Sequence, residues 1–342
     1  MRALRLREYG APPVLDGVDE PKITGPWDVT VDIGAAGLCR TDLHIVEGQW
    51  EAIQHPRLPY TLGHENAGWV REVGSAVSNV APGDKVILHP LVTCGLCLPC
   101  RAGQDSHCEN ARFPGINADG GMAEQLLTNA RAVVKLDQSL EPVQVAALAD
   151  AGLTAYHAVR KAQEILHPGT HAVVIGAGGL GHIGIQTLAA ITNATITVVD
   201  RNESAIVLAQ QLGAHHTVLA TTDDDVQQRV LEITDGGAHV VFDFVGEAGA
   251  ELLAARLLRP RGSHFVIGYG GAISLKTIDI ISREINVVGN LVGTFTDLIE
   301  LMTLTAQGLI TLHTAVYPLA EWSEAINDLE SGRLVGRAIL VP

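Results

Sequence analysis

The sequence is poor in basic residues and has no long apolar run. Lysine and arginine number 23 against 38 aspartates and glutamates, which gives a formal net charge of -15. Nucleic acids and anionic membranes bind to basic patches, so neither is an expected partner. No apolar stretch could span a bilayer, and the charged opening residues lack the apolar segment of a signal peptide. We therefore expect a soluble, cytoplasmic protein.

Cysteine is also scarce, and its distribution is uneven. Four of the five cysteines fall within fifteen residues, with the spacing C-x2-C-x2-C-x7-C. In a reducing compartment this spacing favours metal binding over disulfides, although a disulfide pair or idle thiols remain the alternative. Four thiolates close a tetrahedral site with no open position. The sequence therefore predicts a structural zinc ion held by Cys94, Cys97, Cys100 and Cys108.

The fifth cysteine lies in a segment that is dense in potential catalytic groups. Residues 37–44 read Gly-Leu-Cys-Arg-Thr-Asp-Leu-His, and His64 follows after Gly63. Catalytic zinc takes three protein ligands from cysteine, histidine and carboxylates, and keeps a fourth position open. Cys39 and His64 fit two of these places. The residues alone leave the third ligand open.

The length of 342 residues suggests two domains, and the residue pattern differs between two parts of the chain. The first part has short apolar runs broken by glycine and proline, which is typical of a small irregular β-barrel; the cysteine lobe, residues 92–110, projects from it. An alanine-rich helical segment follows around 141–165, with a break expected near Gly152. After it, six strands alternate with helices, which predicts a doubly wound parallel sheet. We expect domains at 1–151 and 152–289, with residues 290–342 returning to the first.

A glycine-rich turn opens the second domain. Gly176, Gly178 and Gly181 form a G-x-G-x-x-G pattern, with Gly179 and Leu180 between them, after the expected strand 171–175 and before a helix. This arrangement lets a pyrophosphate approach the backbone at the helix N-terminus. Asp200 ends the next strand and is placed to bind the ribose hydroxyls, which favours NAD over NADP; the positive charge of Arg201 beside it favours the opposite preference. The alternative for Asp200 is a solvated turn residue.

Together these motifs resemble the zinc-dependent medium-chain alcohol dehydrogenases. The resemblance rests on residues 37–44, on Gly63-His64-Glu65 with Gly68, on the cysteine lobe and on residues 176–181, and it covers nearly the whole chain in the expected order. It implies a fold that is part α/β and part β, in which a GroES-like barrel is interrupted by a Rossmann domain. It also implies reversible, NAD-linked oxidation of a primary or secondary alcohol with two zinc ions per chain.

The resemblance supplies roles for residues around the catalytic zinc. It makes Asp150 the third ligand, where many relatives have cysteine; the alternative is a helix-capping aspartate. It makes Glu65 an accessory group that can approach the zinc, and Asp42 the carboxylate that orients the ligand imidazole. Zinc then lowers the pKa of the alcohol, and Thr41 passes the proton through the cofactor ribose to His44; the alternative for His44 is a surface or satisfied histidine.

The resemblance also supplies cofactor and substrate contacts. It assigns Arg40 and Arg337 to the pyrophosphate. It gives Trp50 a place in the substrate pocket, with a core tryptophan as the alternative. Further cofactor contacts are Gly268, Leu291 and Val292, and Leu291 also borders the substrate.

Three rival functions and the assembly stay open at this point. A polyol or threonine dehydrogenase and a ketone-preferring secondary alcohol dehydrogenase belong to the same superfamily. A non-catalytic lens-type protein or a zinc-free quinone reductase shares the fold but usually lacks the zinc ligands. The length resembles that of bacterial tetramers, so we expect a homotetramer, with a dimer as the alternative.

Overall fold

The structure, a computed structural model, describes all 342 residues, apart from the side chain of Gln54. The chain forms two compact units. Unit 1 comprises Met1–Leu153, Thr294–Ala306 and Leu312–Pro342, and unit 2 comprises Thr154–Gly293 and Gln307–Thr311.

Unit 1 is built mainly from strands of its first 135 residues. The strands are β1 (Arg2–Leu6), β2 (Val14–Gly17), β3 (Asp28–Leu38), β4 (Tyr60–Thr61), β5 (Glu65–Val73), β6 (Lys85–Leu88), β7 (Gln125–Asn129) and β8 (Val133–Lys135). Short helices connect them: α1 (Arg40–Val46), α2 (Glu51–Gln54), α3 (Leu98–Arg101), η1 (Asp105–His107), η2 (Ala130–Ala132), α4 (Pro142–Val145) and η3 (Ala146–Ala149). Later in the chain come α11 (Phe295–Ala306), β15 (Thr314–Pro318), η4 (Leu319–Glu321), α12 (Trp322–Glu330) and β16 (Arg337–Val341).

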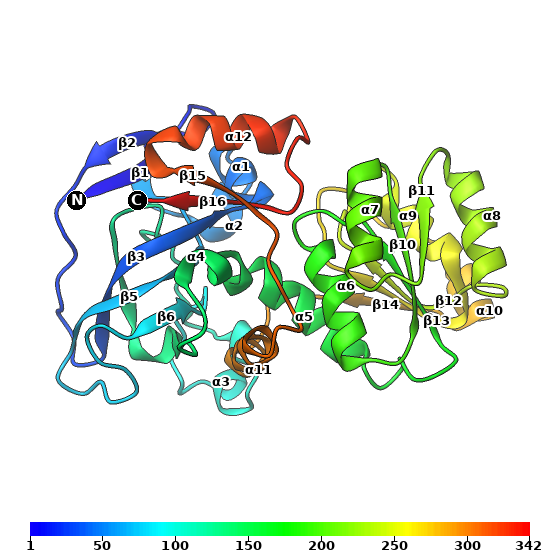
Figure 1. The fold of residues 1–342 in the computed structure, drawn as a ribbon, viewed down its shortest axis with the longest axis horizontal. Helices are drawn as coiled ribbons and strands as arrows, with labels where there is room; N and C mark the ends of the chain where they lie inside the picture. Colours follow the sequence, from blue (N-terminus) through cyan, green and yellow to red (C-terminus); the bar gives the residue numbers. More distant parts are fainter. The chain divides into compact units, whose positions relative to one another are not determined.

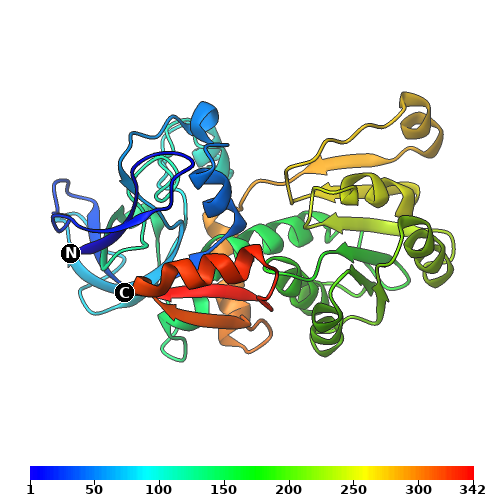
Figure 2. The same ribbon diagram turned by 90° about the horizontal axis from the view of Figure 1, so that it is seen from above.

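The long strand β3 organises unit 1. Most of its residues are buried, and it pairs antiparallel with β5, β7 and β16, so the end of the chain lies beside its beginning. The main sheet has the order β15-β16-β3-β5-β6-β8, and a smaller sheet joins β2, β1 and β4. Helix α12 runs along β15 and β16 in both views (Figures 1 and 2). This pairing brings Arg337, at the start of β16, next to the segment that holds Cys39.

Unit 2 contains the parallel sheet. Its strands are β9 (His171–Ile175), β10 (Thr195–Asp200), β11 (His216–Leu219), β12 (Ala238–Asp243), β13 (Leu258–Val266) and β14 (Asn286–Gly289). Its helices are α6 (Gly181–Ile191), α7 (Glu203–Gln211), α8 (Asp223–Ile233), α9 (Ala250–Leu257) and α10 (Thr277–Arg283). The strand order is β11-β10-β9-β12-β13-β14, and every neighbouring pair is parallel.

Helices cover both faces of this sheet (Figure 1). One apolar cluster joins β9, β10 and β12 to α6 and α7, around side chains such as Val174, Leu188 and Phe242. The other joins the same strands to α8 and α9, around Val241, Val230 and Leu257. Strands buried on both faces read as continuous apolar runs, which is why the central strands β9, β10 and β12 were visible in the sequence. The predicted six-stranded, doubly wound sheet is confirmed.

The alanine-rich helical segment is interrupted two residues earlier than the glycine suggested. The 3-10 helix η3 ends at Ala149, Asp150 follows as its C-cap residue, and α5 (Ala151–Ala162) begins directly after Asp150. Gly152 lies inside α5, where a Cβ would come within 2.5 Å of the Leu148 side chain. Gly152 therefore permits close packing, and Asp150 holds a position between two helices.

Among the described residues, no helix has the length and apolar character that a membrane crossing requires.

Candidate functional site

Four potential metal ligands converge in unit 1 from three separate segments. Cys39 follows β3 and caps α1, His64 and Glu65 stand at the start of β5, and Asp150 is the C-cap residue of η3. One ligand atom from each residue lies within 4.8 Å of the other three. Cys39, His64 and Glu65 are buried, and Asp150 is half-buried. Residues up to 111 positions apart in the sequence thus form one compact cluster.

Asp42 connects two members of this cluster. Its Oδ2 accepts a hydrogen bond from the backbone N–H of Cys39 at 2.8 Å, while its Oδ1 lies 3.3 Å from Nδ1 of His64. The other ring nitrogen of His64, Nε2, lies 3.5 Å from Oδ2 of Asp150. A carboxylate on one nitrogen fixes the ring orientation and leaves the second nitrogen directed at the cluster.

The cluster has the properties of a cation site. Both ring nitrogens of His64, and Oδ1 of Asp42 and of Asp150, are buried without a well-aligned hydrogen bond in the described structure. Burial lowers the pKa of His64, but the carboxylates of Asp42 and Asp150 outweigh it and raise this pKa well above its usual value. Buried polar atoms normally have partners. A thiolate, an imidazole and a carboxylate are the donor set of zinc, so these residues fit the ion.

Glu65 is held by an arginine from the far end of the chain. Both carboxylate oxygens accept hydrogen bonds from the guanidinium of Arg337, from Nε at 3.2 Å and from Nη2. Oε1 also accepts from the backbone N–H of Ala151, next to Asp150. Both side chains are buried. Because both Glu65 oxygens are bonded to the guanidinium, the carboxylate is not free to act as a metal ligand. We expected Arg337 to contact a pyrophosphate; in the structure its guanidinium lies on Glu65.

The proposed proton-transfer residues lie on the short helix α1. Thr41 and His44 are three positions apart, which puts them on the same face of the helix. His44 is buried and Thr41 half-buried, while Arg40 is exposed at the first helical position. Trp50 caps the next helix, α2, and is half-buried.

The four clustered cysteines form a second group in unit 1. Their sulfur atoms lie within 4.8 Å of one another, and none is in a disulfide. Backbone N–H groups of Leu96 and Cys97 point at the Cys94 sulfur and lower its pKa to about 6. N–H groups directed at a sulfur stabilise a thiolate, which is the form that binds a metal. Four thiolates with this geometry fit a closed zinc site.

The cysteine lobe gives a testable prediction. Cys97→Ser is expected to lower the melting temperature, because metal binding in such a loop contributes folding free energy. The catalytic metal should remain, since Cys97 is not in the first cluster. The measurement is thermal unfolding together with metal content per chain, and an unchanged melting temperature would contradict a structural role.

The glycine-rich turn of unit 2 has the features of a pyrophosphate site. Gly176 has φ +87°, a conformation that favours glycine, directly after β9. A Cβ on Gly181 would lie 1.8 Å from the carbonyl oxygen of Gly176, so no other residue fits there. A Cβ on Gly178 would meet nothing within 4 Å, which leaves open space beside the start of α6. The turn therefore fits a dinucleotide.

Asp200 faces this turn from the end of β10. Its Oδ2 accepts from the N–H of Ala177 at 2.6 Å, and its Oδ1 accepts from the N–H of Asn202 at 2.8 Å. Asp200 and Arg201 line a cavity of about 150 Å³. The carboxylate thus orders the glycine turn and also borders a cavity beside it.

Sequence reasoning missed the loop on the other side of this cavity. Val245 and Glu247 belong to this loop, and they line the cavity together with Asp200 and with Asp223 at the start of α8. Asp243, at the end of β12, accepts hydrogen bonds from the N–H groups of Val245 and Gly246 and so fixes the loop. The signal was available, because a loop after a parallel strand lies at the ligand-binding edge of the sheet.

The remaining predicted cofactor residues lie on neighbouring loops of unit 2. Gly268 follows β13, and a Cβ on it would come within 2.3 Å of the Val245 backbone. Leu291 and Val292 follow β14; Leu291 is half exposed, and Val292 is buried with φ +49°.

Comparisons with known proteins agree with this geometry. The family model described as "Alcohol dehydrogenase GroES-like domain" matches residues 25–138, and the one described as "Zinc-binding dehydrogenase" matches residues 179–307. An NAD-dependent alcohol dehydrogenase of Sulfurisphaera tokodaii is 36% identical over the full length of both chains. A D-arabinose 1-dehydrogenase (NADP(+)) of Saccharolobus solfataricus is 34% identical over 100% of this chain and 97% of its own.

A solved structure shares the entire fold. The alcohol dehydrogenase of Aeropyrum pernix is 45% identical, covers 100% of both chains and superposes with a TM-score of 0.96. The chain therefore belongs to the zinc-dependent medium-chain alcohol dehydrogenases, as the sequence motifs predicted, and it is an enzyme.

Proposed function

We propose that this enzyme catalyses the reversible, NAD-linked oxidation of a primary or secondary alcohol to an aldehyde or ketone. The observation that carries the proposal is the convergence of Cys39, His64 and Asp150 in one buried cluster. The glycine turn with Asp200, and the full-length similarity to NAD-dependent alcohol dehydrogenases, support the cofactor.

Each residue of the cluster has a distinct role in this proposal. Cys39, His64 and Asp150 hold one zinc ion, and the four-cysteine group holds a second. When bound, the catalytic zinc supplies Lewis acidity towards an alcohol oxygen, and the nicotinamide supplies the hydride acceptor. Asp42 keeps His64 in its orientation, and Arg337 keeps the Glu65 carboxylate in place.

Thr41 and His44 handle the proton that the alcohol loses. The hydroxyl of Thr41 can accept this proton and donate its own, but it has no pKa near neutrality. An imidazole titrates near pH 7 and can release the proton to solvent. Their common face on α1 supports this division of labour.

His44→Gln is expected to slow alcohol oxidation by about a hundredfold or more near pH 7, since a general base typically contributes about 10²–10⁴-fold. Glutamine has a similar size but cannot take a proton. The loss should shrink at high pH, where hydroxide replaces the base, and metal content should stay the same. The measurement is a pH–rate profile of both proteins with one alcohol. Parallel profiles would mean that His44 is not the base.

The cofactor preference follows from Asp200. We expect NAD to be used at least tenfold better than NADP, a factor that corresponds to about 1.4 kcal/mol, because the carboxylate repels a 2′-phosphate. Asp200→Asn should narrow the gap, since the amide keeps a hydrogen-bond acceptor for Ala177 but loses the charge. The test is kcat/KM for both cofactors in both proteins. Equal use of NAD and NADP by the unmodified enzyme would refute the role of Asp200.

The substrate class is tested by a panel of primary, secondary and polyhydric alcohols and aldoses, each with NAD and with NADP. The proposal predicts the highest kcat/KM for a simple alcohol with NAD. The runner-up is a sugar or polyol dehydrogenase, favoured by the 34% identical D-arabinose 1-dehydrogenase. Highest activity on an aldose or polyol would replace the proposal with that alternative.

We also propose that the enzyme is a homotetramer and that it is located in the cytoplasm. The crowding of four cysteines into one metal-binding loop favours a reducing compartment. The chain length, which resembles that of bacterial tetramers, supports the assembly, and sedimentation equilibrium tests it.

A further inference from the structure

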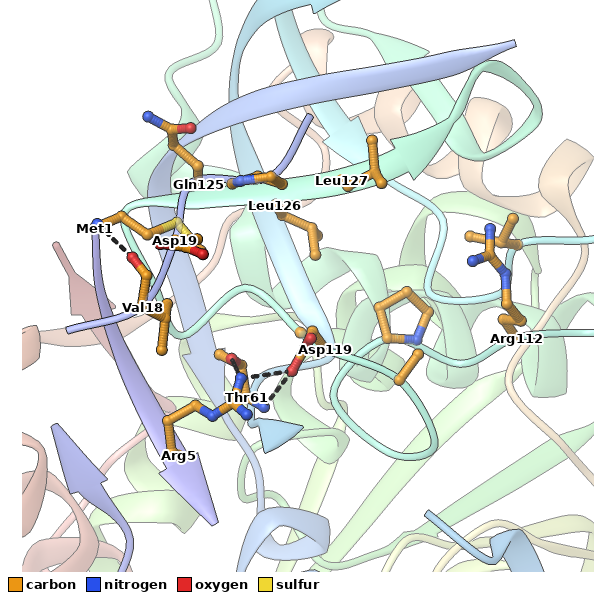
Figure 3. A pocket seen from close by; sticks show the side chains of 15 residues that line it. Met1, Arg5, Val18, Asp19, Thr61, Arg112, Asp119, Gln125, Leu126 and Leu127 are labelled. Atoms are coloured by element: carbon orange, nitrogen blue, oxygen red, sulfur yellow. Dashed lines mark hydrogen bonds and ion pairs between the residues drawn. The ribbon is translucent and has the colours of Figure 1, made fainter. Parts of the chain in front are cut away.

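Unit 1 has a cavity that the proposed reaction does not use. Its volume is about 310 Å³, within the range of small-molecule sites. Its walls come from β1, from residues 18–21, from β7 and from the loop of residues 112–120 (Figure 3). None of the clustered metal ligands lines it.

The walls combine apolar surface with two arginines, Arg5, which is paired, and Arg112, which is not paired with any described side chain. Leu126, Leu127 and Pro114 supply apolar surface. The guanidinium of Arg5 is already engaged, because it donates to Asp119 at 3.0 Å and to Thr61 at 3.2 Å.

Arg112 stands on the other side of the cavity from Arg5 and Asp19 (Figure 3). Its backbone is fixed by two hydrogen bonds to Val92. Its guanidinium has neither a hydrogen bond nor an ion pair among the side chains that the structure describes, and its charge acts on Asp28 without pairing with it. Arg112 is exposed, so its guanidinium is accessible to a ligand from solvent. A planar guanidinium beside an apolar wall fits a carboxylate with an apolar body.

The loop that forms one wall of the cavity is also hydrogen-bonded to residues 61–63, which directly precede His64. Asp119 accepts from the N–H of Thr61 at 2.8 Å, the bond drawn in Figure 3, and Gly120 donates to the carbonyl of Thr61 at 2.8 Å. Gly121 donates to the carbonyl of Gly63 at 2.9 Å.

Side-chain and backbone packing tighten this connection. The ring of Phe113, next to Arg112, lies edge-on to the ring of His64, with centroids 6.0 Å apart. Gly115 and Gly120 approach Gly63 so closely that a Cβ on either would lie within 2.5 Å of its carbonyl group. A shift of this loop would therefore move the backbone next to His64, since packed elements do not deform independently.

We propose that this cavity binds a small organic carboxylate with an apolar body, that Arg112 pairs with its carboxylate, and that occupancy restrains His64 through residues 112–121. The site lies outside the catalytic cluster and would act as a regulatory site. Binding does not depend on turnover, so it can be tested even if the proposed reaction proves wrong.

The test is calorimetric titration of the zinc-loaded enzyme with hexanoate, with hexanamide as the uncharged probe of the same length. Hexanoate should bind at least tenfold more tightly than hexanamide. Arg112→Gln should weaken the binding of hexanoate at least tenfold, and Arg112→Glu should abolish it. Arg229→Gln removes an exposed arginine on α8 and serves as the matched control; it should bind like the unmodified enzyme.

A second measurement separates this cavity from carboxylate binding at the catalytic metal. Hexanoate should slow release of the catalytic zinc to a chelator about threefold or more in the unmodified enzyme and in Arg229→Gln, but not in Arg112→Gln. Equal hexanoate affinity in Arg112→Gln and the unmodified enzyme would overturn the proposal, as would the absence of binding. Arg112-dependent binding with unchanged zinc release would overturn the link to His64.

Discussion

Replacing Asp150 with alanine is expected to release one zinc ion per chain and to abolish nearly all turnover. The Asp150 carboxylate lies 3.5 Å from Nε2 of His64 and belongs to a cluster of four ligand atoms. Without it, only Cys39 and His64 remain as direct ligands, because Glu65 is bonded to Arg337. Even changes outside the ligand shell cost about 10–100-fold in metal affinity or activity, so loss of a ligand should cost more.

Asp150→Cys is the matched control, because a thiolate also binds zinc. This variant should keep two zinc ions and measurable activity, while Asp150→Asn, with a neutral oxygen, should fall between cysteine and alanine. Elemental analysis and kcat/KM of the three variants give the comparison. Full activity with both ions in Asp150→Ala would mean that another residue, with Glu65 as the first candidate, completes the site.

Arg337→Met is expected to destabilise the protein strongly. It leaves the Glu65 carboxylate buried without its guanidinium, and breaking a buried ion pair in this way costs about 3–5 kcal/mol. The same change frees Glu65 beside the metal ligands. Urea unfolding of the variant and the unmodified protein measures the loss.

The double variant Arg337→Met, Glu65→Gln separates the charge from the packing. It removes the uncompensated carboxylate and keeps an acceptor for the N–H of Ala151, so it should regain a large part of the lost stability. If the double variant were as unstable as Arg337→Met, the effect would come from packing of β16 and not from the ion pair.

The sequence predicted those features whose residues lie close together in the chain. The glycine turn, the four cysteines and the segment from Cys39 to His44 each fall within fifteen residues, and their spacing alone limits what they can form. The central strands of unit 2, β9, β10 and β12, were visible because both of their faces are buried. Asp150 came from resemblance alone, because its position between η3 and α5 has no local signature.

Contacts between distant segments were not predictable in the same way. Glu65 and Arg337 are 272 residues apart, and they meet because β16 and β5 both pair with β3 in a particular register. No sequence period specifies that register. The sequence therefore did not reveal that Arg337 pairs with Glu65, or that Gly152 makes room for Leu148 inside α5.

Anomalous diffraction from crystals at the zinc absorption edge tests the central claim most directly. The account predicts two peaks per chain, one within the four-cysteine group and one bonded to Cys39, His64 and Asp150, at about 2.3 Å from sulfur and about 2.0–2.2 Å from nitrogen and oxygen. A single peak at the four cysteines, or a second peak that lacks Cys39, His64 or Asp150 as a ligand, would contradict it.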